Sequence, residues 1–304
     1  MCGRAACNCG ADSIFRSARA LRSFHPQGAS HANASDTEVG HCPNNEIAWK
    51  NSASFAPYET NIRPGDYLTV LHAKDVSSNV TSEPMEIEIA TVKWGIHAQF
   101  SHLVINARSE TVAKSKYFQT FAGRRCIICV TGYMEWFSPI KTNCTKQPFY
   151  FYKKHSSTPS DPPLTWLAGI WDGSDHCVIL TTNACDDVKW CHSRMPALLT
   201  SNNDAWNWIN PSKSFADGLR LLHSSNDFLG WHKIRPDFAR HFDQVKKECA
   251  SIQTYDDQKG FTKKRMESTQ ILAPYAPVTL DKYFGSKKFK SGSLETMKKE
   301  AEYP

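Results

Sequence analysis

The chain opens with Met1-Cys2-Gly3-Arg4, and Cys2 is the residue whose position offers the most specific chemistry. Methionine aminopeptidases remove Met1 when the next side chain is small, so we expect the mature chain to begin at Cys2. An N-terminal cysteine places an α-amine, with a reference pKa of about 8, beside a thiol. With an aldehyde the amine forms an imine, and the thiol then closes a stable five-membered thiazolidine ring. The alternative is that Cys2 is an idle residue on a frayed terminus.

A second polar cluster, residues 106–111, reads Asn-Ala-Arg-Ser-Glu-Thr and directly follows the apolar residues 103–105. At the end of a strand, Asn106 and Arg108 can bind a phosphate or the edge of a base. Alternatively, the same residues form the start of a helix with ordinary surface charges. The residues alone do not decide between these two interpretations.

A third cluster, residues 132–136, reads Gly-Tyr-Met-Glu-Trp and follows another apolar, strand-like segment, residues 126–131. Because Glu135 stands between two large apolar neighbours, we expect it to be partly desolvated. Desolvation favours the protonated carboxyl group and suits it to proton transfer. A solvent-exposed glutamate on an edge strand is the competing interpretation.

A fourth cluster, residues 191–196, reads Cys-His-Ser-Arg-Met-Pro and follows the apolar segment 178–182. His192 can act as a general acid or base, and Arg194 can hold an anion. A single histidine is more often a surface or packed residue. This cluster alone therefore does not indicate a functional site, and it does so only together with the other clusters.

Many short strands and few helices must position these clusters, which predicts an α+β fold. Asp12-Ser13 can cap a helix that carries Ile14, Ala18 and Leu21 on one face. Residues 25–46 are rich in small and polar residues and are typical of a loop or insertion. The expected strands are residues 67–72, 86–94, 103–105, 125–130, 149–152, 167–171 and 178–182, and the expected later helices are residues 206–209 and 215–222.

The composition is that of a soluble protein without a membrane span, because no apolar run approaches about 18 residues. No signal peptide opens the chain, so the eleven cysteines are better explained as reduced thiols than as disulfides. Zinc is the rival explanation for the close pairs Cys7/Cys9 and Cys126/Cys129. The second pair lies in an apolar strand where residues three apart face opposite sides, which favours core packing. We therefore expect no metal site.

Seven motifs occur in order along the chain, and together they resemble the SOS response-associated peptidase (SRAP) family over roughly residues 2–250. They are Met-Cys-Gly-Arg at the start, Asn-Ile-Arg-Pro-Gly at 61–65, Trp94-Gly95, Asn-Ala-Arg-Ser-Glu-Thr at 106–111, Gly-Tyr-Met-Glu-Trp at 132–136, Gln147-Pro148-Phe149 and His-Ser-Arg-Met-Pro at 192–196. The chain departs from the family pattern at residues 96–100, which are shorter and more polar, and near residues 230–255, which match only loosely.

The resemblance implies one SRAP-type domain over residues 2–250, built around a curved, barrel-like, mainly antiparallel sheet with flanking short helices. It implies a basic groove for single-stranded DNA and covalent crosslinking to abasic sites through Cys2. Neither a cofactor nor a metal is implied. In a eukaryote the protein would act in the nucleus, at replication forks, where it would shield the lesion during repair.

The resemblance also assigns roles to residues of this chain. Cys2 is expected to be the nucleophile, Glu135 to shuttle protons during imine formation and crosslink reversal, and His192 to assist sugar ring opening. Five residues are expected to hold phosphates and deoxyribose: Arg4, Asn106, Arg108, Thr181 and Arg194. Trp94 and Trp136 are expected to stack bases, a contact worth about 1–3 kcal/mol per base.

Two rival functions remain open. In a cysteine peptidase, Cys2 would be the nucleophile and His192 its base. Family members with a propeptide release it by self-cleavage, and since only Met1 precedes Cys2 here, we expect no such step. In a non-covalent reader of modified cytosine, no bond to DNA would form. Only the abasic-site crosslinker gives a denaturation-resistant adduct with DNA.

Residues 251–304 are predicted to be a flexible basic tail, with ten basic against seven acidic residues in a chain of net charge +6. Within it, Leu280, Tyr283 and Phe284 would lie on one side of a short 3₁₀-like turn. This spacing resembles the motif by which replication proteins dock on the sliding clamp, proliferating cell nuclear antigen. Pro277 replaces the usual leading glutamine. The alternative is an aromatic pair without a partner.

A peptide spanning residues 274–292 is predicted to bind the sliding clamp, because exposed aromatic side chains in so polar a segment favour a partner. Replacing Tyr283 and Phe284 by alanine in this peptide should abolish retention on immobilised clamp. Equal retention of the two peptides would show that Tyr283 and Phe284 do not bind the clamp.

Overall fold

The computed structural model describes residues 3–24, 47–74, 85–97, 103–137, 146–154 and 163–234 of the 304-residue chain. The chain divides into two units, Met1–Asp243 and Gln244–Pro304, and all described residues belong to the first. Cys2, the insertion at 25–46 and the tail with its clamp motif lie outside the described residues. The predicted domain boundary near residue 250 therefore stays a prediction.

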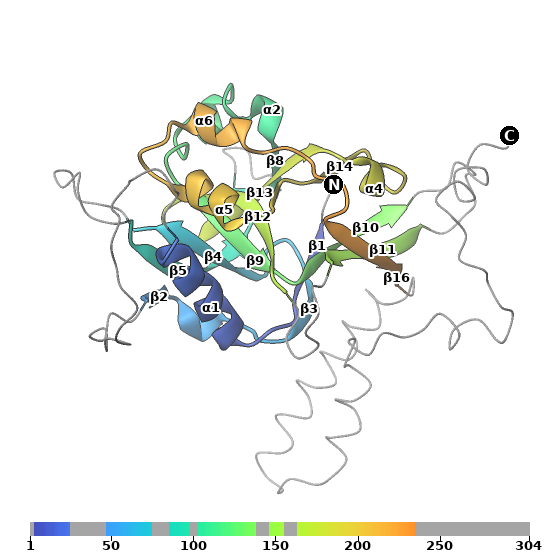
Figure 1. Ribbon diagram of the computed structural model, residues 1–304, viewed down its shortest axis with the longest axis horizontal. Helices are drawn as coiled ribbons and strands as arrows, with labels where there is room; N and C mark the ends of the chain where they lie inside the picture. Colours follow the sequence, from blue (N-terminus) through green and yellow to red (C-terminus); the bar gives the residue numbers. More distant parts are fainter. Residues whose placement is uncertain are drawn as a thin grey trace, which may run out of the picture. The chain divides into compact units, whose positions relative to one another are not determined.

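The larger sheet has nine strands: seven in the order β14-β13-β12-β9-β4-β5-β2, with β15 paired to β12 and β8 paired to β13. An additional parallel pairing of β13 with β5 closes five of these strands into a barrel-like ring (Figure 1). Their bounds are β2 Trp49–Lys50, β4 Tyr67–Ala73, β5 Ile87–Trp94, β8 Asn106–Arg108, β9 Arg125–Val130, β12 Thr165–Trp171, β13 His176–Asn183, β14 Arg194–Pro196 and β15 Leu198–Leu199.

A second sheet of five strands is ordered β16-β11-β10-β1-β3 and is antiparallel throughout. The chain passes from the ring into this sheet at Thr131, which joins β9 to β10. The bounds are β1 Arg4–Cys7, β3 Glu59–Ile62, β10 Gly132–Phe137, β11 Gln147–Lys153 and β16 Leu229–Lys233, and a separate two-stranded sheet pairs β6 Ile96–His97 with β7 Leu103–Val104.

The helices are short and lie outside the sheets, so the predicted α+β class and mainly antiparallel sheet are confirmed (Figure 1). Helix α1 begins at Ala11 with Gly10 as its N-cap, so the predicted cap at Asp12-Ser13 was wrong: the helix begins two residues earlier. None of the helices within the described residues is long and apolar enough to cross a membrane. The helices are α1 Ala11–Arg22, α2 Ser109–Val112, α3 Lys116–Gln119, α4 Asp186–Lys189, α5 Asn202–Ile209 and α6 Phe215–Arg220.

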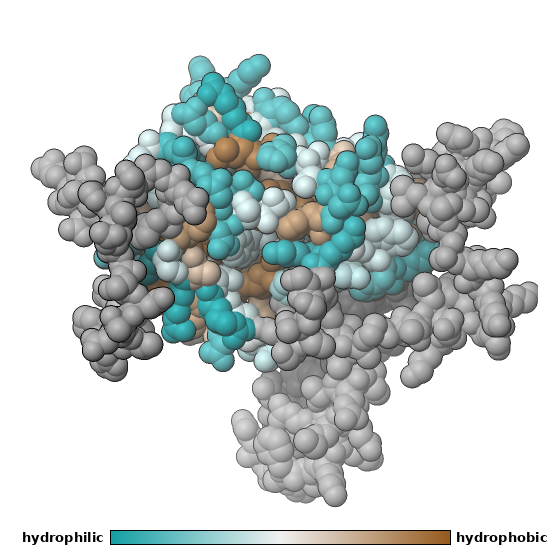
Figure 2. Space-filling view, viewed as in Figure 1, coloured by the Kyte–Doolittle hydropathy of each residue, from teal (hydrophilic) through white to brown (hydrophobic). Residues whose placement is uncertain are grey.

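One continuous core fills the ring and extends under the second sheet. Both faces of β9 are buried, and Cys126 and Cys129 are each completely buried within it, as core packing predicts. None of the seven cysteines in the described residues forms a disulfide. On the face shown in Figure 2, apolar residues surface only as small patches between polar ones.

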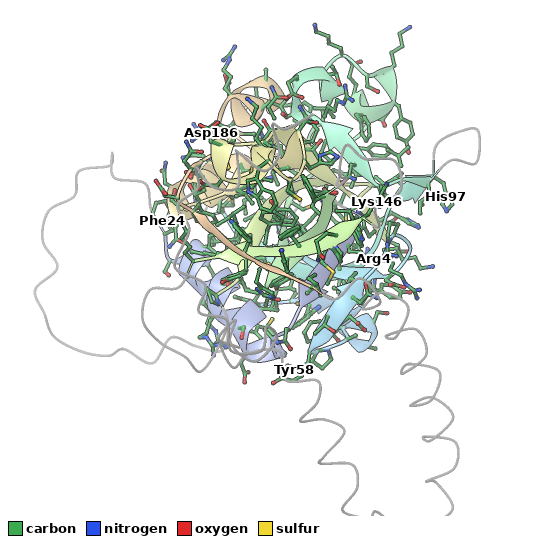
Figure 3. The ribbon with its side chains drawn as sticks, turned by 90° about the vertical axis from the view of Figure 1, so that its right-hand side faces the viewer. Arg4, Phe24, Tyr58, His97, Lys146 and Asp186 are labelled. Atoms are coloured by element: carbon green, nitrogen blue, oxygen red, sulfur yellow. The ribbon has the colours of Figure 1, made fainter. Side chains whose placement is uncertain are left out.

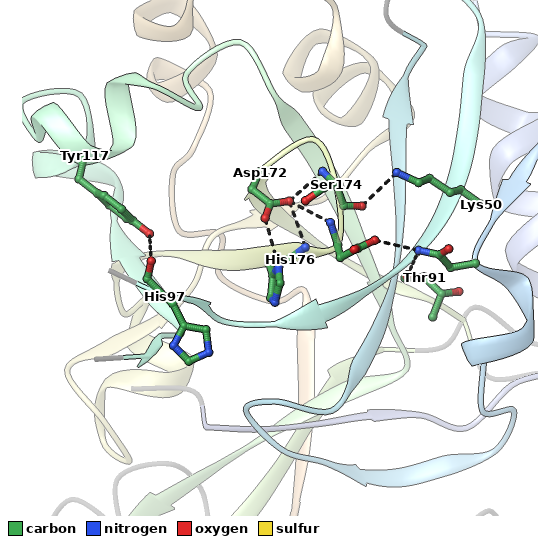
Figure 4. Close-up of polar contacts among 9 residues, drawn as sticks. Lys50, Thr91, His97, Tyr117, Asp172, Ser174 and His176 are labelled. Atoms are coloured by element: carbon green, nitrogen blue, oxygen red, sulfur yellow. Dashed lines mark hydrogen bonds and ion pairs between the residues drawn. The ribbon is translucent and has the colours of Figure 1, made fainter. Parts of the chain in front are cut away.

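The hairpin between β12 and β13 is held by Asp172, whose Oδ1 accepts backbone N–H groups of Ser174, Asp175 and His176 at 2.9–3.1 Å (Figure 4). Burial alone would raise the pKa of Asp172, but these N–H groups lower it below its ordinary value. Asn51 links the turn to β5 by donating to Asp175 Oδ1 and to Thr91 O. The hairpin therefore fixes β13, whose far end carries residues of the candidate site.

Helices α5 and α6 are attached to the ring by Arg125, a buried arginine at the start of β9. Its guanidinium donates to the backbone carbonyls of Asn210, Lys213 and Ser214 at 2.5, 2.8 and 3.0 Å. It also lies 5.8 Å from the Trp208 ring centroid. Burial lowers the pKa of Arg125.

We predict that Arg125→Met lowers the free energy of unfolding by about 2–4 kcal/mol, because three carbonyl oxygens lose a charged donor. Urea denaturation followed by far-ultraviolet circular dichroism measures the change. Arg124→Met, on the exposed neighbouring arginine, should alter stability by no more than about 0.5 kcal/mol. Equal losses in the two variants would contradict this role.

Candidate functional site

The start of the chain is held beside the Gly-Tyr-Met-Glu-Trp motif by backbone pairing. Strand β1 runs antiparallel to β10, with Arg4 opposite Met134 and Ala6 opposite Gly132. A Cβ atom on Gly132 would lie 2.4 Å from Phe151 O, so any side chain at this position would displace the neighbouring strand. Arg4 is thereby held opposite Met134, the residue directly before Glu135.

Glu135 is buried, with 4% of its surface exposed, on a strand that has partners on both sides. The alternative of an exposed glutamate on an edge strand is therefore wrong. Its Oε1 accepts the backbone N–H of Trp136 at 3.3 Å. Phe149 lies opposite it on β11. The predicted desolvated setting of this carboxylate is confirmed.

Arg4 and Trp136 lie on the opposite face of the same sheet from Glu135, since side chains alternate along a strand. The Arg4 guanidinium lies 5.9 Å from the Trp136 ring centroid, and its Nη1 donates to Gly3 O at 2.8 Å. Both side chains are partly exposed. Figure 3 shows Arg4 on the side of the molecule that also carries Lys146.

The turn after α4 packs against β11 and brings Cys191 close to Glu135. The Trp190 and Phe149 rings pack edge to face, with their centroids 4.7 Å apart. Burial, together with the charge of Glu135, raises the pKa of the Cys191 thiol to about 12. His192 follows directly, and its Nδ1 accepts the backbone N–H of Arg194 at 3.0 Å. The same Nδ1 lies 3.2 Å from Arg194 O, so either ring nitrogen can carry the proton in the neutral ring.

Arg194 forms a second polar group by pairing with a carboxylate from another part of the chain. Its Nη1 and Nη2 donate to Glu110 Oε1 and Oε2 at 2.8 and 2.9 Å, a bidentate pair. The same guanidinium donates to Asn183 Oδ1 at 2.8 Å and to Thr181 O at 2.7 Å. The hydrogen bond from Arg194 lowers the pKa of Glu110.

Asn106 and Arg108 lie on β8, which runs parallel to β13, with Asn106 beside Ile179 and Arg108 beside Thr181. The two side chains share one face because they are two residues apart. Arg108 is exposed and Asn106 partly exposed, while Ala107 between them is buried. Arg108 thus points toward solvent beside the Arg194–Glu110 pair.

Two of the expected DNA contacts are buried in this structure. Trp94 is completely buried and its indole N–H donates to Ile105 O at 2.9 Å, so its faces are filled by the core and cannot stack a base. Thr181 is also completely buried, with its hydroxyl against Ala107 O. Trp94 and Thr181 therefore support the site from the core. Arg194 is partly exposed and pairs with Glu110, and its expected contact with DNA stays a prediction.

The structure also contains members of the site to which the sequence analysis gave no role. Glu110 holds Arg194 although 84 residues separate them, and its place inside the Asn-Ala-Arg-Ser-Glu-Thr motif was the available signal. Cys191 lies close to Glu135, with no sequence signal beyond its position before His192. Within the described ranges, no three metal-binding side chains gather.

Comparisons with known proteins agree on one family. A family model described as SOS response associated peptidase (SRAP) matches residues 1–240. The abasic site processing protein HMCES of Xenopus tropicalis is 25% identical over 261 residues, covering 73% of this chain and 70% of that protein. The HMCES protein of Gallus gallus is 26% identical over 267 residues, covering 77% and 73%.

A bacterial relative and a solved structure extend the comparison. The abasic site processing protein YoaM of Bacillus subtilis is 29% identical over 138 residues, which is 42% of this chain and 57% of that protein. A crystal structure of a Bacteroides thetaiotaomicron protein has a TM-score of 0.53 and 20% identity, covering 79% of this chain and 94% of that one, and shows a shared fold. Because the family model spans most of the 304 residues, the chain belongs to the SOS response associated peptidase (SRAP) family.

Proposed function

We propose that this protein recognises abasic sites in single-stranded DNA and traps the ring-opened aldehyde as a thiazolidine on Cys2. The pairing of β1 with β10 is the observation that carries the proposal, because it fixes the start of the chain beside a buried carboxylate. Relatives that align over most of this chain are named abasic site processing proteins. Their name and this geometry support the same chemistry.

The covalent chain limits where Cys2 can act. Successive Cα atoms are about 3.8 Å apart, so the Cys2 Cα lies within about 8 Å of the Arg4 Cα. If the β1–β10 register continues by one residue, Gly3 stands opposite Glu135. A glycine there leaves the space above the carboxylate free of a side chain. We therefore propose that the α-amine of a chain beginning at Cys2 acts beside Glu135.

The chemistry proceeds in two steps. The amine adds to the aldehyde carbon, and the carbinolamine loses water to form an imine, with Glu135 donating the proton that the departing hydroxyl needs. The thiol then adds across the C=N bond, so a C–S bond forms and the thiol proton returns to nitrogen. Glu135 accepts and donates protons in the reverse direction when the crosslink opens.

The remaining residues bind the DNA around the lesion. Arg4, Arg108 and Asn106 are at least partly exposed and can contact phosphates and deoxyribose. Trp136 offers a partly exposed ring for a base. His192 assists the opening of the sugar to the aldehyde.

A cysteine peptidase is the second candidate, favoured by the description of the family model as a peptidase. In that reaction Cys2 attacks a peptide carbonyl and His192 is the base. Incubation with single-stranded DNA bearing an abasic site separates the two candidates. A covalent adduct that survives denaturation, seen by intact mass, supports the crosslinker, whereas peptide cleavage without an adduct supports the peptidase.

Cys2→Ser is predicted to abolish the heat-stable adduct, because a hydroxyl cannot close a comparably stable ring. The variant keeps the α-amine, so borohydride reduction should still capture an imine. Denaturing gel electrophoresis with and without reductant measures both products. An equal yield of heat-stable adduct from Cys2→Ser without reductant would exclude the thiazolidine.

Glu135→Gln is predicted to slow adduct formation by roughly tenfold or more, since the amide cannot exchange protons. The effect should lie below the 10²–10⁴-fold typical of general acid–base catalysis, because amine addition to an aldehyde is already facile. Quench-flow sampling of adduct formation measures the rate, and release to competing DNA measures reversal. Glu88→Gln on β5 is the matched control and should change neither rate. Unchanged rates in folded Glu135→Gln would remove this residue from the mechanism.

A further inference from the structure

The face of the five-stranded sheet opposite Glu135 carries a continuous row of large side chains. The registers of three strand pairs place Arg4 opposite Met134, Met134 opposite Tyr150, and Tyr150 opposite His232. Paired residues of antiparallel strands point to the same face, as do residues two apart on one strand. We call this surface the outer aromatic face, formed by Arg4, Met134, Trp136, Tyr150, Tyr152 and His232.

The rings on this face lie against one another as a platform. Tyr150 and Tyr152 are stacked, with centroids 5.8 Å apart and planes 20° apart. His232 lies 5.4 Å from Tyr150 and 5.6 Å from Tyr152. Tyr150 is 7% exposed and donates its hydroxyl to Thr131 Oγ1 at 3.2 Å, so it is the fixed base of the platform. Tyr152 is partly exposed and His232 exposed, so these two can meet a ligand.

The size of the face fits a short run of nucleotides. Neighbouring strands lie about 4.8 Å apart, so the row from Arg4 on β1 to His232 on β16 spans roughly 14 Å. Antiparallel sheets of four strands with exposed aromatic residues stack two or three bases in RNA-recognition domains. Stacking of this kind is tolerant of sequence, because every base has a π face.

The charges around the face suit a polyanion. Strands β11 and β16 carry no carboxylate, and their lysines, Lys153 and Lys233, pair with Leu229 and Phe149 and so lie on the same face as Glu135. Lys146, directly before β11, is exposed, and Figure 3 shows it on the same side of the molecule as Arg4. The one carboxylate of β10, Glu135, lies on the other face. An aromatic face that carries Arg4 and no carboxylate of β10, β11 or β16 favours single-stranded nucleic acid over an apolar protein partner.

We propose that the outer aromatic face stacks two or three bases of the strand that flanks the abasic site, with Tyr152 and His232 as the contacting rings. The inference rests on the proposed function and extends it, because Arg4 and Trp136 belong both to this face and to the lesion site. The aldehyde is held near Glu135 on one face of the sheet, and the adjoining single strand passes over its edge onto the other. Affinity for long DNA then comes largely from a surface that takes no part in the chemistry.

The test measures equilibrium binding of the full chain to fluorescent single-stranded DNA bearing a tetrahydrofuran analogue, which cannot form an aldehyde. One oligonucleotide has twelve nucleotides on each side of the analogue, and two others lack the flank on either the 5′ or the 3′ side. The test variant is Tyr152→Ala with His232→Ala. Tyr152→Phe with His232→Phe is the matched control, since it keeps both aromatic rings.

We expect the alanine variant to bind the long oligonucleotide roughly 5- to 150-fold more weakly for each base that loses its stacking partner. On the oligonucleotide that lacks the flank stacked on the outer aromatic face, the alanine variant should bind with the affinity of the wild type. The phenylalanine variant should match the wild type on all three. Rate measurements with a short true abasic oligonucleotide should give the same crosslinking rate for all variants.

Three outcomes would overturn the inference: an unchanged affinity of the alanine variant for long DNA, an equal loss on all three oligonucleotides, or an equal loss in the phenylalanine variant. The proposed function fails separately, and would be shown to fail if wild-type protein formed no adduct with true abasic DNA. If the protein crosslinks normally but its affinity does not depend on the flanking nucleotides, the proposed function is supported and the proposed stacking face is contradicted.

Discussion

The structure depends on the antiparallel pairing of β1 with β10, which makes the first residues of the chain a central strand of a sheet. The pairing is reinforced at Thr131, whose N–H and hydroxyl both donate to Ala6 O at 2.7 and 3.1 Å. The Thr131 hydroxyl also accepts the N–H of Asn8 at 3.0 Å and the Tyr150 hydroxyl. A chain terminus ordinarily frays. Here the backbone from Arg4 onward is fixed by hydrogen bonds to β10, which is paired with a strand on each of its edges.

The two sheets are coupled because β9 and β10 are consecutive around Thr131. The closed ring holds β9, and β9 continues into the strand that carries Glu135 and pairs with β1. The turn from Trp190 to Arg194 joins the same region from β13, through Trp190 on Phe149 and through the Arg194–Glu110 pair. Groups far apart in sequence therefore meet on rigid elements, which is the arrangement that the proposed proton transfer requires.

The sequence predicted the strands of the ring well, because β4, β5, β9, β12 and β13 are long apolar runs whose type is unmistakable. It did not predict β1 as a strand, since Arg-Ala-Ala-Cys has little strand propensity and gains its conformation from β10 and β3. The predicted burial of Glu135 was correct. Trp94 was misjudged because an indole beside a polar loop is compatible with either burial or exposure. The ion pair between Arg194 and Glu110 was not predicted, because 84 residues separate the two side chains and no local sequence pattern indicates such a contact.

The long sequence separation between β1 and its partner also has a consequence during synthesis. Ala6 and Thr131 are 125 residues apart. At translation rates of about 5–20 residues per second, β10 leaves the ribosome on the order of ten seconds after β1. Until then β1 has no strand on that side, and contacts of such high separation form late in folding. The start of the chain thus remains accessible to trimming enzymes throughout this interval, and β1 pairs with β10 only afterwards.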